Sequence, residues 1–159
     1  MTCIALLKNE QGQETHLLTG SWDKTVCKWD LRTESTNATC TKPELVLRGH
    51  SDFVKSLVIF GNTVFTASSD ATIRQWDLST GKELKLLKGH KRGVEALAVD
   101  LESGILYSGS SDTTIKRWDA QTGQCLFTFE GHLTSVYDLT LTDEGQLFSG
   151  LLSCKSLSL

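Results

Sequence analysis

Large apolar residues recur at the same distances from three Gly-His pairs, which are Gly49-His50, Gly89-His90 and Gly131-His132. The residues four, seven and nine positions after each histidine are Val54, Leu57, Ile59, Val94, Leu97, Val99, Val136, Leu139 and Leu141. Spacings of three and then two interrupt strict strand alternation once, as a single β-bulge does. We therefore predict, after each pair, a strand that faces the core and contains one bulge.

Two further short strands are predicted in each unit. The second strand ends in Thr or Ser and covers residues 16–21, 63–68 or 105–110. The third strand begins with β-branched residues, ends in Trp-Asp and covers residues 25–30, 72–77 or 114–119. Both compositions are typical of strands. In the third strand, alternation predicts that Lys28, Gln75 and Arg117 point outward.

A fourth strand precedes the next Gly-His pair, and its expected core anchors are Leu47, Leu87 and Phe129. Two Thr-Gly pairs, Thr80-Gly81 and Thr122-Gly123, provide the turn into this strand, because glycine adopts positive φ readily. Each full unit is therefore predicted to be a four-stranded antiparallel meander, and the fold class is predicted to be all-β.

A polar phrase repeats with the same period. A Thr or Ser at the end of the second strand is followed four residues later by Asp, and six residues after that by Trp. The copies are Thr19, Asp23 and Trp29, then Thr66, Asp70 and Trp76, then Ser108, Asp112 and Trp118. The units measure 40 to 47 residues, a period that indicates a β-propeller array.

Over residues 1 to about 150, these Gly-His pairs, Asp turns and Trp-Asp pairs resemble the WD-repeat β-propeller family. In that family a loop His, a strand Ser or Thr, a turn Asp and a Trp form a buried hydrogen-bonded tetrad. The resemblance implies two tetrads, made by His50, Thr66, Asp70 and Trp76 and by His90, Ser108, Asp112 and Trp118. Four such groups can satisfy one another's hydrogen bonds. The first unit has no preceding Gly-His pair, so Thr19, Asp23 and Trp29 lack the imidazole.

The predicted blades cover about residues 1–48, 51–88 and 91–130, and half a blade covers 133–150. In the fourth unit the positions of the Asp and the Trp hold Ser153 and Leu159, so residues 151–159 are expected to be an off-pattern tail. Propellers typically have four to eight blades. We therefore expect an incomplete, open array rather than a closed ring. Two copies do not obviously complete it, because neither supplies the missing third and fourth strands of its partner.

Composition and charge narrow the function classes. The net charge of −3 lacks the basic excess of a nucleic-acid binder. Five scattered cysteines without a C-x-x-C pair argue against a zinc knuckle or a disulfide framework, and no apolar stretch approaches 18 residues. We expect no metal, no other cofactor, no small-molecule substrate and no membrane or nucleic-acid partner. The cysteines favour a reducing compartment, the cytosol or the nucleus.

The resemblance places the starts of the first strands and the turns before the Asp residues on the face that usually binds partners. The residues at these positions, called the candidate binding face below, are Trp22, Phe53, Lys55, Ser69, Glu95, Ser111, Ser135 and Tyr137. Three of them, Trp22, Phe53 and Tyr137, are aromatic. Exposed aromatic residues make good interface anchors, but each of the three could equally pack on its neighbouring blade. The first hypothesis is a non-catalytic scaffold or adaptor for other proteins, such as the substrate receptor of a larger complex.

Two alternatives remain open from the sequence. His, Ser or Thr, and Asp are the residue types of an acyl-transfer triad, but their recurrence in successive units argues for architecture. His16 is the one histidine outside the Gly-His pairs, and we expect it to be solvated. The other alternative is a truncated product of a longer scaffold with little independent function.

Overall fold

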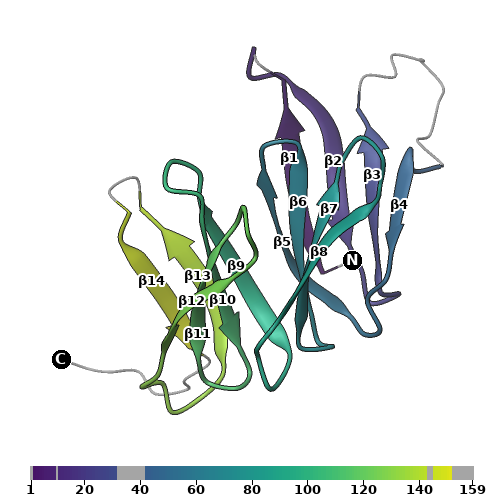
Figure 1. Ribbon diagram of the computed structural model, residues 1–159. Helices are drawn as coiled ribbons and strands as arrows, with labels where there is room; N and C mark the ends of the chain where they lie inside the picture. The colour runs from purple at the N-terminus through teal and green to yellow at the C-terminus, as the bar shows by residue number, and fades with distance from the viewer. Residues whose placement is uncertain (1, 10, 32–41, 143–144, 152–159) are drawn as a thin grey trace, which may run out of the picture.

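The computed structural model describes residues 2–9, 11–31, 42–142 and 145–151, and these residues form four separate antiparallel sheets (Figure 1). The first sheet contains β1 (Cys3–Lys8), β2 (Glu14–Gly20), β3 (Thr25–Asp30) and β4 (Leu45–Arg48). The second contains β5 (Val54–Phe60), β6 (Thr63–Ser68), β7 (Thr72–Asp77) and β8 (Glu83–Lys88). The third contains β9 (Val94–Asp100), β10 (Ile105–Ser110), β11 (Ile115–Asp119) and β12 (Cys125–Phe129), and the fourth contains β13 (Val136–Leu141) and β14 (Leu147–Leu151).

In each four-stranded sheet the strands are hydrogen-bonded in the order of the sequence, which is the meander that the repeated pattern predicts. The chain is therefore all-β, and its sheets are arranged like propeller blades. Among the described residues the sheets do not close into a ring (Figure 1). The predicted tail falls largely on residues 152–159, which lie outside the described residues.

The predicted β-bulge is confirmed in three first strands. The register of β5 shifts between Val54 and Ser56, that of β13 shifts between Val136 and Asp138, and β9 shows the same shift opposite Ser110. The bulge lets the residues four and seven positions after each histidine face the core on the same side. Their exposed fractions lie between 0% and 7%.

The hydrophobic core lies between neighbouring sheets. One cluster joins the first and second sheets through Leu18, Leu47, Leu57 and Trp76, and another joins the second and third sheets. A third cluster packs β13 against β9 and β11. Since these sheets bury their apolar faces against one another, each blade depends on its neighbours for stability.

Two outward-facing predictions are wrong. Lys28 and Gln75 are buried, because their polar ends find partners inside the array. Lys28 Nζ donates to the Leu78 carbonyl at 3.3 Å and pairs with Glu44 at 3.3 Å. Gln75 donates to Thr63 Oγ1 at 3.1 Å and accepts from Lys85 Nζ at 2.9 Å. Buried polar side chains remain stable where such partners satisfy them.

The prediction that His16 is solvated is also wrong. The side chain is buried on β2, and Nε2 lies 3.1 Å from the Glu44 carboxylate, the same group that Lys28 contacts. The carboxylate gives the buried imidazole a polar partner. His16 and Lys28 therefore contact the same group, the Glu44 carboxylate.

The expected core anchor Phe129 is 41% exposed, whereas Leu47 and Leu87 are 2% and 3% exposed. Leu47 packs with Trp76 and Leu87 packs with Trp118, each a residue of the third strand in the following blade. No third strand is present beside β14 in the described part of the chain. The side chain of Phe129 is therefore left uncovered.

Candidate functional site

The second blade joins a loop histidine, a strand hydroxyl, a turn carboxylate and an indole in one hydrogen-bonded row. His50 Nδ1 lies 2.8 Å from Asp70 Oδ2, and Nε2 lies 2.8 Å from Thr66 Oγ1. Trp76 Nε1 donates to the same Thr66 oxygen at 2.8 Å. Since a carboxylate only accepts, the imidazole proton sits on Nδ1.

The third blade repeats this geometry with Ser in place of Thr. His90 Nδ1 lies 2.9 Å from Asp112 Oδ2, and Nε2 lies 2.7 Å from Ser108 Oγ. Trp118 Nε1 donates to Ser108 Oγ at 2.8 Å. The His90 and Asp112 side chains are 1% and 7% exposed, so the hydroxyl is enclosed rather than presented to a substrate. This burial supports a structural role for the row.

A threonine two residues after each turn Asp also belongs to the site. Thr25, Thr72 and Thr114 each donate from Oγ1 to the carboxylate at 2.6 Å, and their backbone N–H groups donate to the same oxygen at 3.0 Å. The repeated Thr/Ser, Asp and Trp phrase does not include these residues. Their signal was present as the repeated pattern Asp-x-Thr.

The surroundings of the tetrads hold the carboxylates charged and one imidazole neutral. Burial acts to raise the pKa of Asp112, but hydrogen bonds from Thr114, Lys91 and His90 hold it well below its usual range. The pKa of Asp70 is likewise low, because hydrogen bonds from its neighbours outweigh burial. Burial lowers the pKa of His90, against the opposing effect of Asp112.

The outer blades contain parts of the same arrangement. In the first blade Trp29 Nε1 donates to Thr19 Oγ1 at 3.0 Å, while Asp23 is exposed in its turn. In the fourth blade His132 Nε2 lies 3.0 Å from Ser149 Oγ. The described residues thus form two full tetrads and two partial ones.

In the second and third blades, the Asp of the Trp-Asp pair caps the following turn. Asp77 Oδ1 accepts from the backbone N–H groups of Ser79 and Thr80, both at 2.8 Å. Hydrogen bonds, first that of the Ser79 hydroxyl, lower the pKa of Asp77 to about 2. Gly81 and Gly123 then adopt φ of 72° and 77°, as predicted for the turn into the fourth strand.

On the candidate binding face, Trp22 and Phe53 form a stacked pair. Their ring centroids are 5.6 Å apart with an interplanar angle of 26°, and the residues are 64% and 39% exposed. Trp22 lies in the turn between β2 and β3, and Phe53 directly precedes β5. We call these two residues the aromatic pair.

The other residues of this face lie at equivalent places in the later blades. Lys55, Glu95 and Tyr137 occupy the bulges of β5, β9 and β13. Lys55 Nζ pairs with Glu95 at 3.6 Å, Ser111 Oγ donates to Glu95 at 2.8 Å, and Tyr137 is 43% exposed. Ser69 is held by a backbone bond to Phe53, and Ser135 is half-buried before β13. The bulges thus place one residue from each of three blades on this face.

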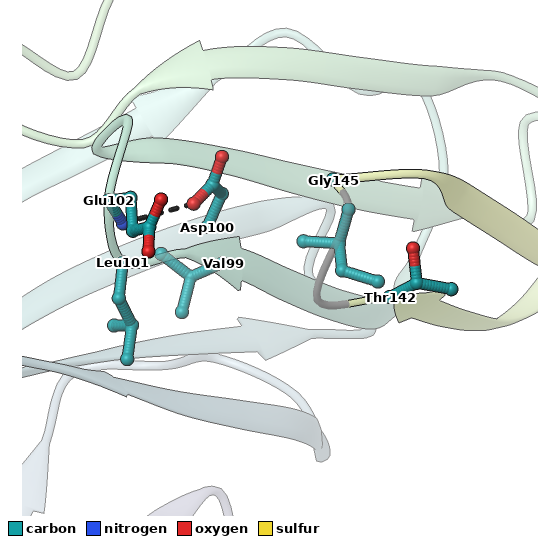
Figure 2. Close-up of a pocket in the computed structure, with 7 residues that line it drawn as sticks. Val99, Asp100, Leu101, Glu102, Thr142 and Gly145 are labelled. Atoms are coloured by element: carbon teal, nitrogen blue, oxygen red, sulfur yellow. Dashed lines mark hydrogen bonds between the residues drawn. The ribbon is translucent and has the colours of Figure 1, made fainter.

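A pocket of about 610 Å³ lies at the turns of the third and fourth blades and contains Asp100, Glu102 and Thr142 (Figure 2). The Asp100 carboxylate accepts from the backbone N–H of Glu102 at 3.0 Å and from Ser103. These bonds, first that of the Ser103 side chain, lower the pKa of Asp100. Asp100 thus stabilises its own turn, and none of the described residues that line this pocket is a histidine or a cysteine.

Within the described ranges, no three His, Cys, Asp or Glu side chains gather as metal ligands would. The same residues include no helix with the length and apolar character needed to cross a membrane.

The WD domain, G-beta repeat (WD40) matches four segments of the chain, residues 2–30, 41–77, 81–119 and 123–158. These segments include both tetrads and most of the sequence. The chain belongs to the WD40 family. WD40 repeats typically act as interaction scaffolds, are usually non-catalytic and generally bind proteins. The fourth WD40 match also extends across most of residues 151–159, which the sequence pattern set apart as a tail.

Several curated WD40 relatives match part of the chain. An uncharacterized WD repeat-containing protein of Schizosaccharomyces pombe is 33% identical over 61% of this chain and 26% of the relative. The ubiquitin fusion degradation protein 3 homolog of Caenorhabditis elegans is 41% identical over 54% of this chain and 10% of the relative. Nuclear distribution protein PAC1 of Candida glabrata is 38% identical over 45% of this chain and 15% of the relative. The matches therefore span about a quarter or less of each of these relatives.

Proposed function

We propose that this chain is a non-catalytic scaffold that binds a protein partner through its candidate binding face. The observation that carries the proposal is the aromatic pair, in which two exposed rings stack on each other at the junction of the first and second blades. Aromatic residues dominate the energy of protein interfaces because they bury much area with few rotatable bonds.

The surroundings of the aromatic pair also suit a protein partner. Stacking restrains both rings before binding, so less conformational entropy is lost on association. The Lys55–Glu95 ion pair and Ser111 add polar groups on the same face, as the rim of an interface commonly does. The buried tetrads restrain the turns of the second and third blades, since their His–Asp hydrogen bonds join the Asp turns to the Gly-His loops.

A finer form of the proposal is a substrate-receptor subunit in a larger complex, in the cytosol or the nucleus. The name of one relative refers to the degradation of ubiquitin fusions. The scattered cysteines, which include no C-x-x-C pair, support a reducing compartment.

Capture from a cell extract tests the proposal. The intact chain is immobilised beside the double variant Trp22→Ala, Phe53→Ala, and bound proteins are quantified by mass spectrometry. We expect one set of proteins to be retained by the unchanged chain and to fall at least tenfold with the double variant, because two interface anchors are lost.

The matched control is Leu101→Ala, which removes another exposed apolar side chain, at the turn between β9 and β10. This variant should retain the same proteins as the unchanged chain. Equal recovery by all three chains, or no specific recovery by any, would show that the aromatic pair does not bind a partner.

A further inference from the structure

The fourth blade contains two members of a tetrad, a loop histidine and a strand serine, at hydrogen-bond distance. His132 Nε2 lies 3.0 Å from Ser149 Oγ, close to the 2.8 Å and 2.7 Å found in the second and third blades. In those blades the imidazole Nδ1 also meets an Asp, and the hydroxyl accepts a Trp indole N–H. Among the described residues no Asp or Trp supplies these two contacts to His132 and Ser149.

Among the described residues of the fourth blade, none occupies the place that a Trp ring takes in the second and third blades. A Cβ atom built on Gly49 would lie 2.9 Å from the Trp76 ring, and one on Gly89 would lie 3.1 Å from the Trp118 ring. At Gly131 a Cβ atom would meet nothing within 4 Å. The aromatic ring that covers the Gly-His loop is thus missing from the described part of this blade.

The surface beside this place is apolar. Phe129 is 41% exposed and Phe127 is 56% exposed, and the two rings lie edge to face with centroids 4.8 Å apart. The equivalent residues of the first and second blades are Leu47 and Leu87. Leu47 packs in one cluster with Trp76, and Leu87 packs in another with Trp118. A large ring at the same place would therefore contact Phe129.

Among the described residues, the backbone of β14 is paired along one edge only. β6 and β10 pair with a strand on each side, whereas β14 pairs only with β13 in the described residues. An unpaired strand edge offers a row of N–H and C=O groups that an added strand can satisfy. Positions 153 and 159, which would carry the Asp and the Trp, hold Ser and Leu.

We propose that the β14 edge binds an extended segment of another polypeptide that carries an Asp and a Trp six residues apart. The segment adds a third strand to the fourth blade by β-augmentation. Its indole donates to Ser149 Oγ and covers Gly131 and Phe129, and its carboxylate accepts from His132 Nδ1. The six-residue spacing is that of Asp70 and Trp76 and of Asp112 and Trp118, which make the same contacts within the chain.

A labelled peptide with the sequence of residues 111–119, SDTTIKRWD, is a direct probe, because it contains this spacing. Fluorescence anisotropy with the intact chain should show saturable binding of one peptide per chain. A peptide with Ala in place of Trp, and another with the Asp moved one position closer, should each bind at least tenfold more weakly. Each loses a buried contact, and a factor of ten corresponds to about 1.4 kcal/mol.

Variants of the chain locate the binding site. His132→Ala and Ser149→Ala should each weaken peptide binding about tenfold. Thr140→Ala is the matched control, because it removes an exposed hydroxyl from β13 and should leave binding unchanged. Hydrogen exchange on the unchanged chain is independent of any folding defect in the variants: the peptide should protect amides of β14 but not those of β8.

Three results would overturn the proposal. One is the absence of saturable binding, and another is equal affinity for the Trp-containing and Ala-containing peptides. The third is a dimer of the chain in which β14 is already protected and which the peptide does not dissociate, since a second copy would then occupy the edge.

Discussion

At the scale of single residues, the tetrad joins groups that are costly to bury alone. The Trp118 indole donates a hydrogen bond to Ser108 Oγ. Ser108 is hydrogen-bonded to His90, and His90 is hydrogen-bonded to Asp112. Lys91 donates its backbone N–H to the same carboxylate at 2.8 Å. Each polar group thereby has a partner, and removing one member leaves several of the others unpaired.

Asp112→Ala should lower the free energy of unfolding by about 1–3 kcal/mol, because His90 and the Lys91 N–H lose their acceptor in a buried site. Urea unfolding followed by circular dichroism measures the change. Asp23→Ala is the matched control. Asp23 is exposed and has no histidine partner, so its replacement should cost less than about 1 kcal/mol. Equal losses in the two variants would contradict a special role for the complete tetrad.

The same groups predict that stability falls in acid. Burial lowers the pKa of His90 in the folded chain below its ordinary value of 6.5, and hydrogen bonding lowers the pKa values of Asp70 and Asp112 below 3.8. The unfolded chain therefore binds more protons as the pH falls, first at the histidine and then at the carboxylates. The free energy of unfolding should decrease from pH 7 to pH 3.

Urea unfolding at intervals of half a pH unit measures this decrease. The contribution of the carboxylates is complete above the pKa of the unfolded groups and is lost as the pH falls through their folded values. A free energy of unfolding that stays constant from pH 7 to pH 3 would show that these groups are not linked to folding.

At the scale of strands, the same position can be core or surface according to what lies beside it. Leu87 on β8 is covered by the third blade, whereas Phe129 at the equivalent place on β12 lies at an open end. The difference in exposure comes from the Trp on the third strand of the next blade, which is present beside Leu87 and absent beside Phe129 among the described residues. Strand identity therefore comes from local pattern, while burial comes from the neighbouring blade.

Leu87→Ala should lower the free energy of unfolding by about 2–5 kcal/mol, because it removes buried atoms and leaves a cavity. Phe129→Ala removes more atoms but should cost at most about 1 kcal/mol, because the ring is already 41% exposed. Chemical unfolding of both variants under identical conditions tests the comparison. A larger loss at Phe129 would show that the open end is covered in solution.

At the scale of the whole molecule, the described sheets form an open row with two different ends (Figure 1). Ile4 and Leu6 on β1 are 58% and 42% exposed, and Phe148 on β14 is 55% exposed. In a repeat array each unit is stabilised by its nearest neighbours, so the end units are covered on one side only. The peptide experiment on β14 probes one of these ends, and the capture experiment probes the candidate binding face.

Much of the fold was predictable because its determinants are local and repeated. Positions such as Val94 and Leu97 kept their size and spacing in each unit, and the bulge between them followed from that spacing. The tetrads followed from the family resemblance, but the threonines of Asp-x-Thr were overlooked. Their role depends on two bonds to one carboxylate oxygen that only the folded turn displays.

The sequence by itself determined the strand order, the repeat and the family, because each of them is recorded in side-chain patterns that recur along the chain. Only the tertiary structure decided that Lys28 and His16 are buried beside Glu44, that Phe129 is exposed, and that Trp22 stacks on Phe53. Each of these outcomes depends on atoms from a different strand or blade. Burial and stacking are properties of neighbours in space, which strand alternation along one segment does not specify.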